Sequence, residues 1–376
     1  MVMKPAADKK VLIAGLAALC LGCSPGKSTD GNGADIRFDR SSMPEQIALH
    51  DPEEIVFEDL LHPAAFHVMY DTLVVVQNQP DCEHLIEMYS LAGRTPVGRF
   101  AQKGGGPDDF LSCTCFVPAG NDSVIYALDQ NSGTYSIIHV PLTLAEKRLH
   151  ISRRFRYSPE LHPQTEIIPA GEGHYIGYNF WYIGSDRYSN RVPALKKYAI
   201  PAPDDYSATQ PQLTDYSNFV ASVNTARLAR NPLTKHIWFF DGHRDRIAIY
   251  DDSLNAVRTI SGPDHYSVSY DAAQSNLPIS FVTFGEGKTY RAYSGYTVTD
   301  KYIYVIYEGV NGSAFDPDDL PQSTEVFRFD PEGNLVCSYT LDRFIYTVSV
   351  DSSDRYLYCT ARTSATEEAH FLRYRL

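Results

Sequence analysis

Residues 302–307 (YIYVIY) and 325–334 (EVFRFDPEGN) carry the pattern that decides the fold of this 376-residue chain. The first stretch is a short, continuous apolar run, which favours a strand covered on both faces. The second begins as an alternating strand, of the kind found nearer a solvated rim, and ends in a polar turn. Together the two stretches predict a β-hairpin followed by a tight turn.

The same hairpin recurs six times along the chain. The apolar strands are expected at 73–76, 124–128, 175–180, 237–240, 302–307 and 356–359. The alternating strands are expected at 84–89, 134–140, 194–200, 246–250, 325–329 and 369–376. A period of about 50 residues with four strands per unit is typical of propellers. The sequence therefore predicts an all-β fold, a six-bladed β-propeller with four-stranded antiparallel blades.

Three turns at related positions support this repeat. They span 89–94, 250–255 and 329–334. In each, an aromatic residue ends a strand and a polar turn follows. Gly93, Asn255 and Gly333 are expected at the position that needs a positive φ.

The sixth unit lacks an outer strand. It has an inner strand at 345–350, a second strand and a third strand that ends at Leu376. A strand from the N-terminus can close such a ring and cover the open sheet edge. We expect residues 54–57 to do so, because they precede the first inner strand without a gap; residues 36–40 are the alternative.

The first 22 residues have the layout of an export signal. Lys4, Lys9 and Lys10 precede an uncharged apolar stretch, 11–22, that is too short to cross a bilayer as a helix. Gly22 and Cys23 then supply a small residue and a thiol that can carry lipid. We expect a signal peptide at 1–22, lipidation of Cys23 and an exported protein that is lipid-anchored to the cell envelope, at the outer membrane. An ordinary secretory signal with a chance cysteine is the alternative, and Cys20 departs from the usual cleavage pattern.

A polar linker is expected after the lipidated cysteine. Residues 24–33 contain no aliphatic side chain, so they cannot bury enough apolar area to offset the entropy of ordering. The predicted organisation is a signal peptide at 1–22, a lipidated cysteine and flexible linker at 23–50, and the propeller at 51–376.

Charge and cysteine content limit the function further. The net charge of −13 argues against nucleic-acid binding through phosphate neutralisation, and we expect no nucleic-acid partner. The membrane link is expected to be covalent. Five cysteines remain in the exported domain, an odd number, so at least one thiol is free. Cys337 and Cys359 fall on neighbouring units and can pair, although buried free thiols are the preferred interpretation.

Residues 100–110 (FAQKGGGPDDF) resemble the F-x-x-K-G-x-G-P-x-E-F segment of TolB-like six-bladed propeller lipoproteins from Bacteroidetes-type bacteria. The segment is also similar to the repeat of NHL-type propellers. Asp109 replaces the usual Glu, and the customary Pro after Phe110 is absent. Residues 261–264 (SGPD) look like a worn copy of the same connection. The resemblance implies a six-bladed propeller and says little about activity.

The glycine-rich segment also has a physical interpretation of its own. It must lead from one blade to the next, and Gly104–Gly106 allow backbone angles that other residues cannot adopt. Pro107 stiffens the exit, and Phe110 can fill the space between two blades. A phosphate-cradling loop with Lys103 as counter-ion is the alternative. It lacks the Lys-Ser/Thr pair and the helix that such loops use.

The sequence contains no established catalytic or metal motif. There is no His-Glu-x-x-His, no Gly-x-Ser-x-Gly and no paired histidine at ligand spacing, so no catalytic residue, metal or cofactor is expected. Ligands of a propeller are expected instead at the loop face around its channel. The candidate ligand-binding residues are Asn78, His84, Lys103, Asp109, Trp181, Tyr182, Arg187, Asp241, His243, Arg244, Glu308 and Arg362.

These residues mix aromatic rings, carboxylates and guanidinium groups, which can hold a sugar or a peptide. The first hypothesis is therefore a binding module whose partner is a glycan, a peptide or an envelope protein. The second is a carbohydrate-active enzyme, a lyase or hydrolase that uses the central channel. The third is a scaffold within an envelope complex.

Overall fold

The structure is a computed structural model of the chain. It describes residues 35–60, 63–116, 123–157, 166–171, 173–179, 182–187, 196–199, 225–265, 271–274, 280–283, 290–311, 320–362 and 369–376. The expected signal peptide, Cys23 and residues 24–33 lie outside the described residues. Residues 31–376 form one compact unit.

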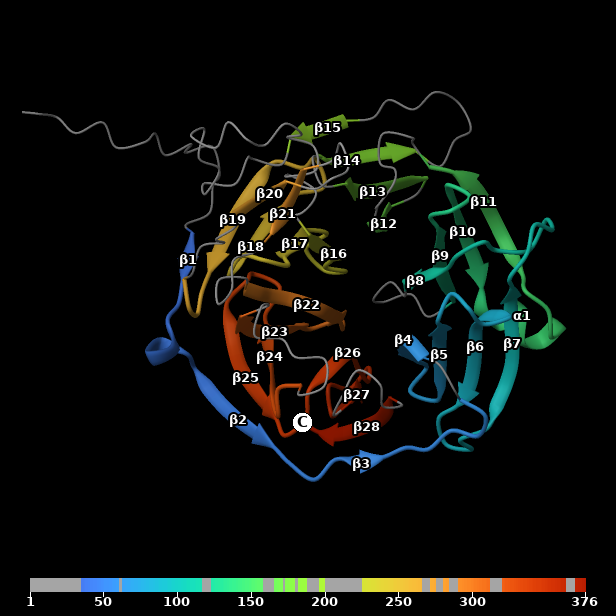
Figure 1. Cartoon of the computed structure of the whole chain (residues 1–376), viewed down its shortest axis with the longest axis horizontal. Helices are drawn as coiled ribbons and strands as arrows, with labels where there is room; N and C mark the ends of the chain where they lie inside the picture. The colour runs from blue at the N-terminus through green and yellow to red at the C-terminus, as the bar shows by residue number, and fades with distance from the viewer. Residues whose placement is uncertain are drawn as a thin grey trace, which may run out of the picture. The chain divides into compact units, whose positions relative to one another are not determined.

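Six sheets stand in a ring in this unit, each built on four antiparallel strands that form one blade (Figure 1). Blades 1 to 3 consist of β4 (Pro63–Met69), β5 (Leu73–Asn78), β6 (His84–Ser90) and β7 (Pro96–Gln102); β8 (Thr114–Phe116), β9 (Val124–Asp129), β10 (Thr134–His139) and β11 (Ile151–Arg156); and β12 (Glu166–Gly171), β13 (His174–Asn179), β14 (Tyr182–Arg187) and β15 (Lys196–Ala199). Blades 4 to 6 consist of β16 (Ala226–Arg230), β17 (Ile237–Asp241), β18 (Arg246–Tyr250) and β19 (Ala256–Ser261); β22 (Tyr290–Val298), β23 (Ile303–Asn311), β24 (Thr324–Phe329) and β25 (Leu335–Leu341); and β26 (Ile345–Val350), β27 (Tyr356–Ala361), β28 (His370–Arg375) and β3 (Glu53–Glu54). The predicted six-bladed propeller is confirmed.

Blade 3 differs from the prediction in one strand. Residues 194–200 were expected to be its third strand, but β15 is the fourth, and β14 is the third. The reason is the short distance in sequence between β13 and β14, because Asn179 pairs with Tyr182. The third strand of blade 3 therefore begins sooner than the spacing of the other blades suggests.

The ring is closed by the N-terminal part of the unit, as predicted. β3 pairs antiparallel with β28, and the Ile55 backbone nitrogen donates to the Phe371 oxygen at 2.8 Å. Ile55 and Phe57 are buried, and the Phe57 ring lies 5.0 Å from that of Phe371 and 5.2 Å from that of Tyr89. Because Tyr89 belongs to blade 1 and Phe371 to blade 6, this segment seals the junction between the first and last blades.

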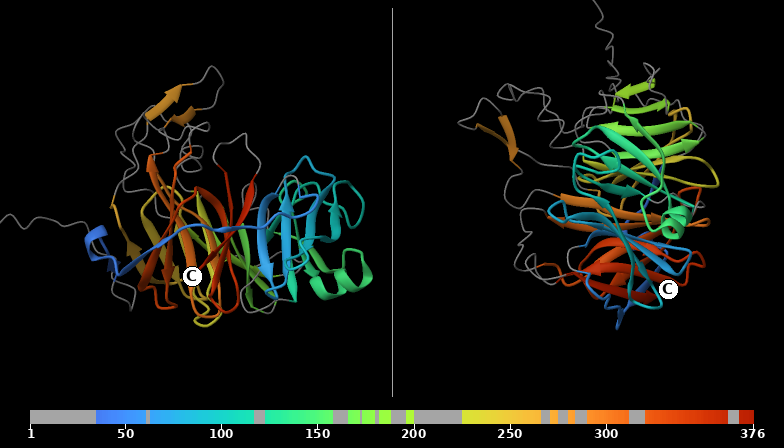
Figure 2. Two further views of the ribbon diagram at one scale, coloured as in Figure 1. Left: turned by 90° about the horizontal axis from the view of Figure 1, so that it is seen from below. Right: turned by 90° about the vertical axis from the view of Figure 1, so that its right-hand side faces the viewer.

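The preceding residues lie on two further blades. β1 (Ile36–Arg37) runs parallel to β19 of blade 4, and β2 (Glu45–Leu49) runs parallel to β25 of blade 5. The alternative closing strand at 36–40 is therefore wrong, and residues 36–49 of the expected linker are part of the propeller. We call residues 35–57 the N-terminal belt; Figure 2 shows it along the outside of the blades.

The three related turns form largely as predicted. Asp251 and Asp330 each use Oδ1 to accept from backbone N–H groups of their own turn, at 2.8 Å from Asn255 and 2.8 Å from Asn334. Gly333 has the expected positive φ of 94°. In the other two turns the left-handed residue is Leu254 (61°) or Arg94 (57°), one position away from the residue expected. Hydrogen bonds to the Asp251 side chain stabilise its turn, so that Leu254 adopts the left-handed conformation although it is not a glycine.

Apolar clusters fill the spaces between neighbouring blades. One joins blades 5 and 6 and contains Cys337 and Cys359, both fully buried and both free thiols. Burial raises the pKa of both thiols. This agrees with the preferred interpretation of the two cysteines as buried free thiols.

Two elements lie outside the blade pattern. Helix α1 (Val140–Glu146) joins β10 to β11, and β20 (Asp271–Gln274) pairs with β21 (Ser280–Thr283) as a separate hairpin, which Figure 2 shows projecting from the ring. Among the residues that the structure describes, no helix has the length and apolar character needed to span a membrane.

Candidate functional site

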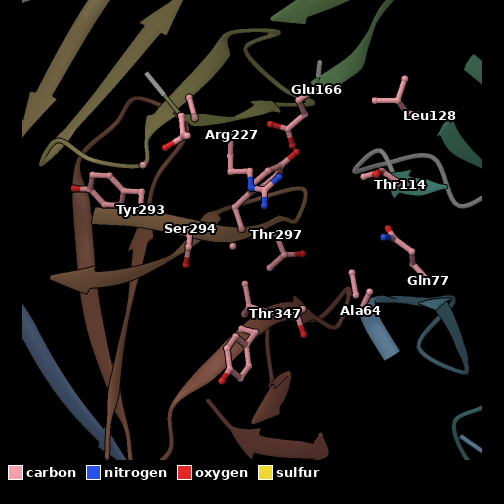
Figure 3. Close-up of a pocket in the computed structure, with 18 of the residues that line it drawn as sticks. Ala64, Gln77, Thr114, Leu128, Glu166, Arg227, Tyr293, Ser294, Thr297 and Thr347 are labelled. Atoms are coloured by element: carbon pink, nitrogen blue, oxygen red, sulfur yellow. The ribbon is translucent and has the colours of Figure 1, made fainter. Parts of the chain in front are cut away.

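A cavity of about 630 Å³ lies on the axis of the ring, where the inner strands of all six blades meet (Figure 3). Residues of β4, β8, β12, β16, β22 and β26 line it. Its size is that of a site for a small ligand or a few sugar rings. The channel is therefore open to a ligand and not filled by apolar side chains.

Glu166 and Arg227 face each other across the junction of blades 3 and 4. Glu166, the first residue of β12, is partly buried, and its Oε2 accepts from the Leu228 backbone nitrogen of β16 at 2.7 Å. Burial raises the pKa of the Glu166 carboxyl to about 7; the positive charge of Arg227 and the Leu228 N–H oppose this shift. Arg227 is exposed to the cavity and points toward Glu166 (Figure 3).

A second pair of this kind belongs to blade 5. Arg291 Nη2 donates a hydrogen bond to Glu308 Oε1 at 3.1 Å, and Arg291 Nε forms an ion pair with Glu308 Oε2 at 2.8 Å. The Glu308 side chain is only 3% exposed, and burial raises its pKa, although the charge of Arg291 opposes this. The bidentate contact neutralises most of the charge of both groups.

Two partly exposed tyrosines line the same cavity. The Tyr296 ring stacks on Phe240, 5.5 Å between centroids. The Tyr346 ring packs against Phe344 at 5.0 Å, and the Arg362 guanidinium lies 5.7 Å from its centre. Hydroxyl and amide groups complete the polar lining, from Gln77, Thr114, Ser294, Thr297 and Thr347.

Of the residues expected to bind a ligand, the structure places His243 and Glu308 in the cavity wall. Arg362 is outside the wall and lies beside the ring of Tyr346, which lines it. Asp241 and Arg244 shape the loop that carries His243: Asp241 Oδ1 accepts from the backbone nitrogens of His243 (2.9 Å) and Arg244 (2.8 Å). The Arg244 guanidinium returns to Asp241 Oδ2 at 3.1 Å. These two residues therefore position a neighbour of the cavity.

Four other expected residues make contacts within blade 1 or within the glycine-rich segment that leads from blade 1 to blade 2. Asn78 Nδ2 donates to the His84 carbonyl oxygen at 3.0 Å and closes the β5–β6 loop. Lys103 Nζ donates to the Pro80 carbonyl oxygen at 2.6 Å, and Asp109 Oδ2 accepts from the Gly106 nitrogen at 2.7 Å. These contacts support the structural interpretation of the glycine-rich segment.

The glycines of this segment serve a different purpose from the one expected. Gly104–Gly106 do not have positive φ angles. A Cβ at Gly104 or Gly106 would instead lie 2.4 or 2.8 Å from Asp109 Oδ2, whereas Gly105 has open space. Phe110 is buried between blades 1 and 2 as expected, and the Arg154 guanidinium lies 4.4 Å from its ring centre.

The remaining expected residues cannot be placed as side chains. Trp181 and Cys23 lie outside the described residues, and so do the side chains of Tyr182 and Arg187, which begin and end β14. Among the residues whose positions the structure gives, no three His, Cys, Asp or Glu side chains gather as metal ligands would.

Sequence reasoning missed Glu166, Arg227, Arg291 and Tyr296. All four lie on inner strands, whereas the expected site was a set of loops. A charged or aromatic residue within an inner strand was the available signal, but inner strands were assigned only in the sixth unit.

Comparison with known proteins supports the fold. Residues 233–353 match the family model described as TolB-like 6-blade propeller-like, which covers less than half of the chain. A member of the DUF4221 family from Bacteroides vulgatus has a similar structure, with a TM-score of 0.51 at 10% identity over 87% of this chain and 96% of that one. Raptor from Chaetomium thermophilum gives a TM-score of 0.49 at 11% identity over 87% of this chain and 29% of that one. No curated protein sequence matches this chain. The chain is thus similar to TolB-like six-bladed propellers, as the residues of its first blade connection predicted.

Proposed function

We propose that this protein is a binding module of the cell envelope that holds a glycan in the central cavity of its propeller. The observation that carries the proposal is the cavity wall, to which all six blades contribute and in which hydroxyl, amide and guanidinium groups lie beside aromatic rings. Sugars are bound by hydrogen bonds to their hydroxyl groups and by stacking on aromatic faces. The hydroxyls of Thr297 and Thr347 and the rings of Tyr296 and Tyr346 offer both kinds of contact.

Binding can be tested on the full chain, purified in detergent, with a glycan array followed by titration calorimetry. Replacing Thr297, which points into the cavity, with Trp fills the site (Figure 3). We expect Thr297→Trp to weaken binding at least about 10-fold. Thr95→Trp, at an exposed turn on blade 1, is the matched control and should bind as the unchanged protein does. Equal binding by both variants would show that the glycan lies elsewhere.

The anchor is a separate part of the proposal. Lipid on Cys23 would hold the propeller at the membrane, with residues between Cys23 and the belt as the tether. Replacing Cys23 with Ala should move the protein from the membrane fraction to the soluble fraction and abolish labelling by radioactive palmitate. A Cys20→Ala variant controls for loss of any cysteine and should stay with the membrane.

A glycoside hydrolase or lyase is the second candidate, because Glu166 has a pKa of about 7 in the same cavity as Glu308. A general acid has such a pKa at neutral pH. Against this, both carboxyl pKa values shift in the same direction, and Glu308 is already engaged by Arg291. An acid and a nucleophile usually show opposed shifts. Release of shorter sugars from a bound oligosaccharide, abolished by Glu166→Gln, would favour the enzyme.

A further inference from the structure

On the basis of the proposed glycan site, we propose that the glycan is acidic and that Arg227 binds the carboxylate of one of its uronic-acid residues. Arg227 lies in the cavity wall between Glu166 and Thr297 (Figure 3). Its side chain is exposed, on the strand of blade 4 nearest the axis. A guanidinium group presents two parallel N–H donors, which match the two oxygens of a carboxylate.

The other arginines of the cavity wall are already paired. Arg291 makes its bidentate contact with Glu308, and Arg230 Nη2 lies 3.2 Å from Asp252 Oδ1. Arg227 has no carboxylate oxygen within 4.0 Å among the described residues. A ligand carboxylate could therefore bind Arg227 without displacing a carboxylate of any described residue.

Glu166 is the carboxyl group whose negative charge would offset the positive charge of Arg227. It is held by the Leu228 N–H in a partly buried position, near Tyr178 of β13 and Tyr296 of β22. Because burial raises its pKa to about 7, a substantial fraction of this carboxyl is neutral at neutral pH. When Glu166 is neutral, no negative charge on it offsets the charge of Arg227. A protonated Glu166 can also donate a hydrogen bond to the same ligand carboxylate.

The neighbouring side chains favour a sugar acid over an acidic peptide. Tyr296 lines the cavity from β22, the strand next to that of Arg227, and β22 also contributes the hydroxyl of Thr297. A uronic-acid residue has its carboxylate on a ring whose hydroxyls and apolar face can use these groups. A peptide carboxylate would use Arg227 and leave the hydroxyl groups unpaired.

The test compares oligouronates with their carboxyl-reduced counterparts, which have the same linkages and a neutral hydroxymethyl group instead. The full chain in detergent is titrated with galacturonate, mannuronate and glucuronate oligosaccharides at pH 6.5. We expect at least one oligouronate to bind and its reduced form to bind roughly 10- to 100-fold more weakly. Arg227→Gln should remove that difference, and Arg227→Lys should restore only part of it.

Arg246→Gln is the matched control, because Arg246 is exposed on the same blade and lies outside the cavity wall. It should keep the full preference for the acidic sugar, and thermal unfolding should show that both glutamine variants remain folded. Equal binding of acidic and reduced sugars would overturn this inference and leave the glycan site standing. Binding of acidic peptides with no binding of any glycan would overturn both proposals.

Discussion

The carboxylates of the loops and those of the cavity are satisfied in different ways. Asp129 and Asp241, at the ends of β9 and β17, are buried and accept hydrogen bonds from backbone N–H groups within or beside their own loop. Glu166 and Glu308 in the cavity instead depend on Leu228 of the next blade and on Arg291. Burial raises the pKa of both cavity carboxyls.

The two kinds of carboxyl group affect the stability of the folded protein in opposite directions. A carboxylate that accepts several backbone N–H groups stabilises the folded state, because those donors would otherwise be buried without partners. A buried carboxyl with a raised pKa costs stability at neutral pH, because the folded state disfavours its charge. We therefore expect the loops and the N-terminal belt to hold the ring together, and the cavity wall to be built for its ligand.

The largest expected effect is that of removing the belt. Deleting residues 35–57 uncovers the edges of three blades and removes the buried Ile55 and Phe57. We expect the free energy of unfolding to fall by at least about 5 kcal/mol, measured by urea denaturation. Deleting residues 24–33 is the control and should change it by less than about 0.5 kcal/mol. Equal stability of the two deletion variants would refute the closing role of the belt.

The next largest effect is expected at Asp129. Its carboxylate accepts from the backbone nitrogens of Leu111 (2.8 Å), Ser112 (3.1 Å), Asn131 (3.1 Å) and Ser132 (3.1 Å). Asp129→Ala leaves these donors without their partner, and we expect a loss of about 2–4 kcal/mol in urea denaturation. Asp300→Ala, at an exposed turn, should stay within about 0.5 kcal/mol of the unchanged protein.

Substitution of Glu166 should have the opposite effect and stabilise the protein. Its pKa is about 7 in the folded protein and about 4.3 in the unfolded chain, so the folded state binds the proton more tightly. Its contribution to stability is complete below the unfolded value and is lost as the pH rises through about 7. Glu166→Gln, whose amide oxygen can still accept from Leu228, should stabilise the protein by about 1–3 kcal/mol at pH 8.5 and by little at pH 4.5. Thermal unfolding across this range would decide; a variant less stable at pH 8.5 would contradict the assignment.

The smallest effect is expected in the glycine-rich connection. A Cβ at Gly104 would displace Asp109 Oδ2 and break its hydrogen bond to the Gly106 nitrogen. Gly104→Ala should therefore cost about 1 kcal/mol in urea denaturation. Gly105→Ala meets open space and should cost nothing measurable, so an equal loss at both positions would count against the close approach as the reason for glycine.

The sequence predicted the features that depend on local patterns. Apolar runs such as 73–76 and turns such as that at Asp330 depend on neighbouring residues, and the missing outer strand of blade 6 pointed to the closing segment. The cavity residues could not be found in this way. Glu166 and Arg227 are far apart in the sequence and meet because blades 3 and 4 are neighbours in the ring. The spacing of residues within one blade therefore cannot predict that contact.

The same reason explains why most of the expected ligand-binding residues contact their own loops. Polar residues at strand ends, such as Asn78 and Asp241, are needed there to satisfy backbone groups. Composition does not distinguish such a residue from one that faces a ligand. The inner strands, which carry Arg227 and Arg291, lacked a clear periodic signal in most units.

The most direct test of the central claim is a crystal structure of the protein with the oligosaccharide that binds it most tightly. Sugar rings should lie within the central cavity, beside Tyr296, with a carboxylate on the Arg227 guanidinium. A sugar bound on the outer wall or on the loops of a single blade, with the cavity free of it, would contradict the claim.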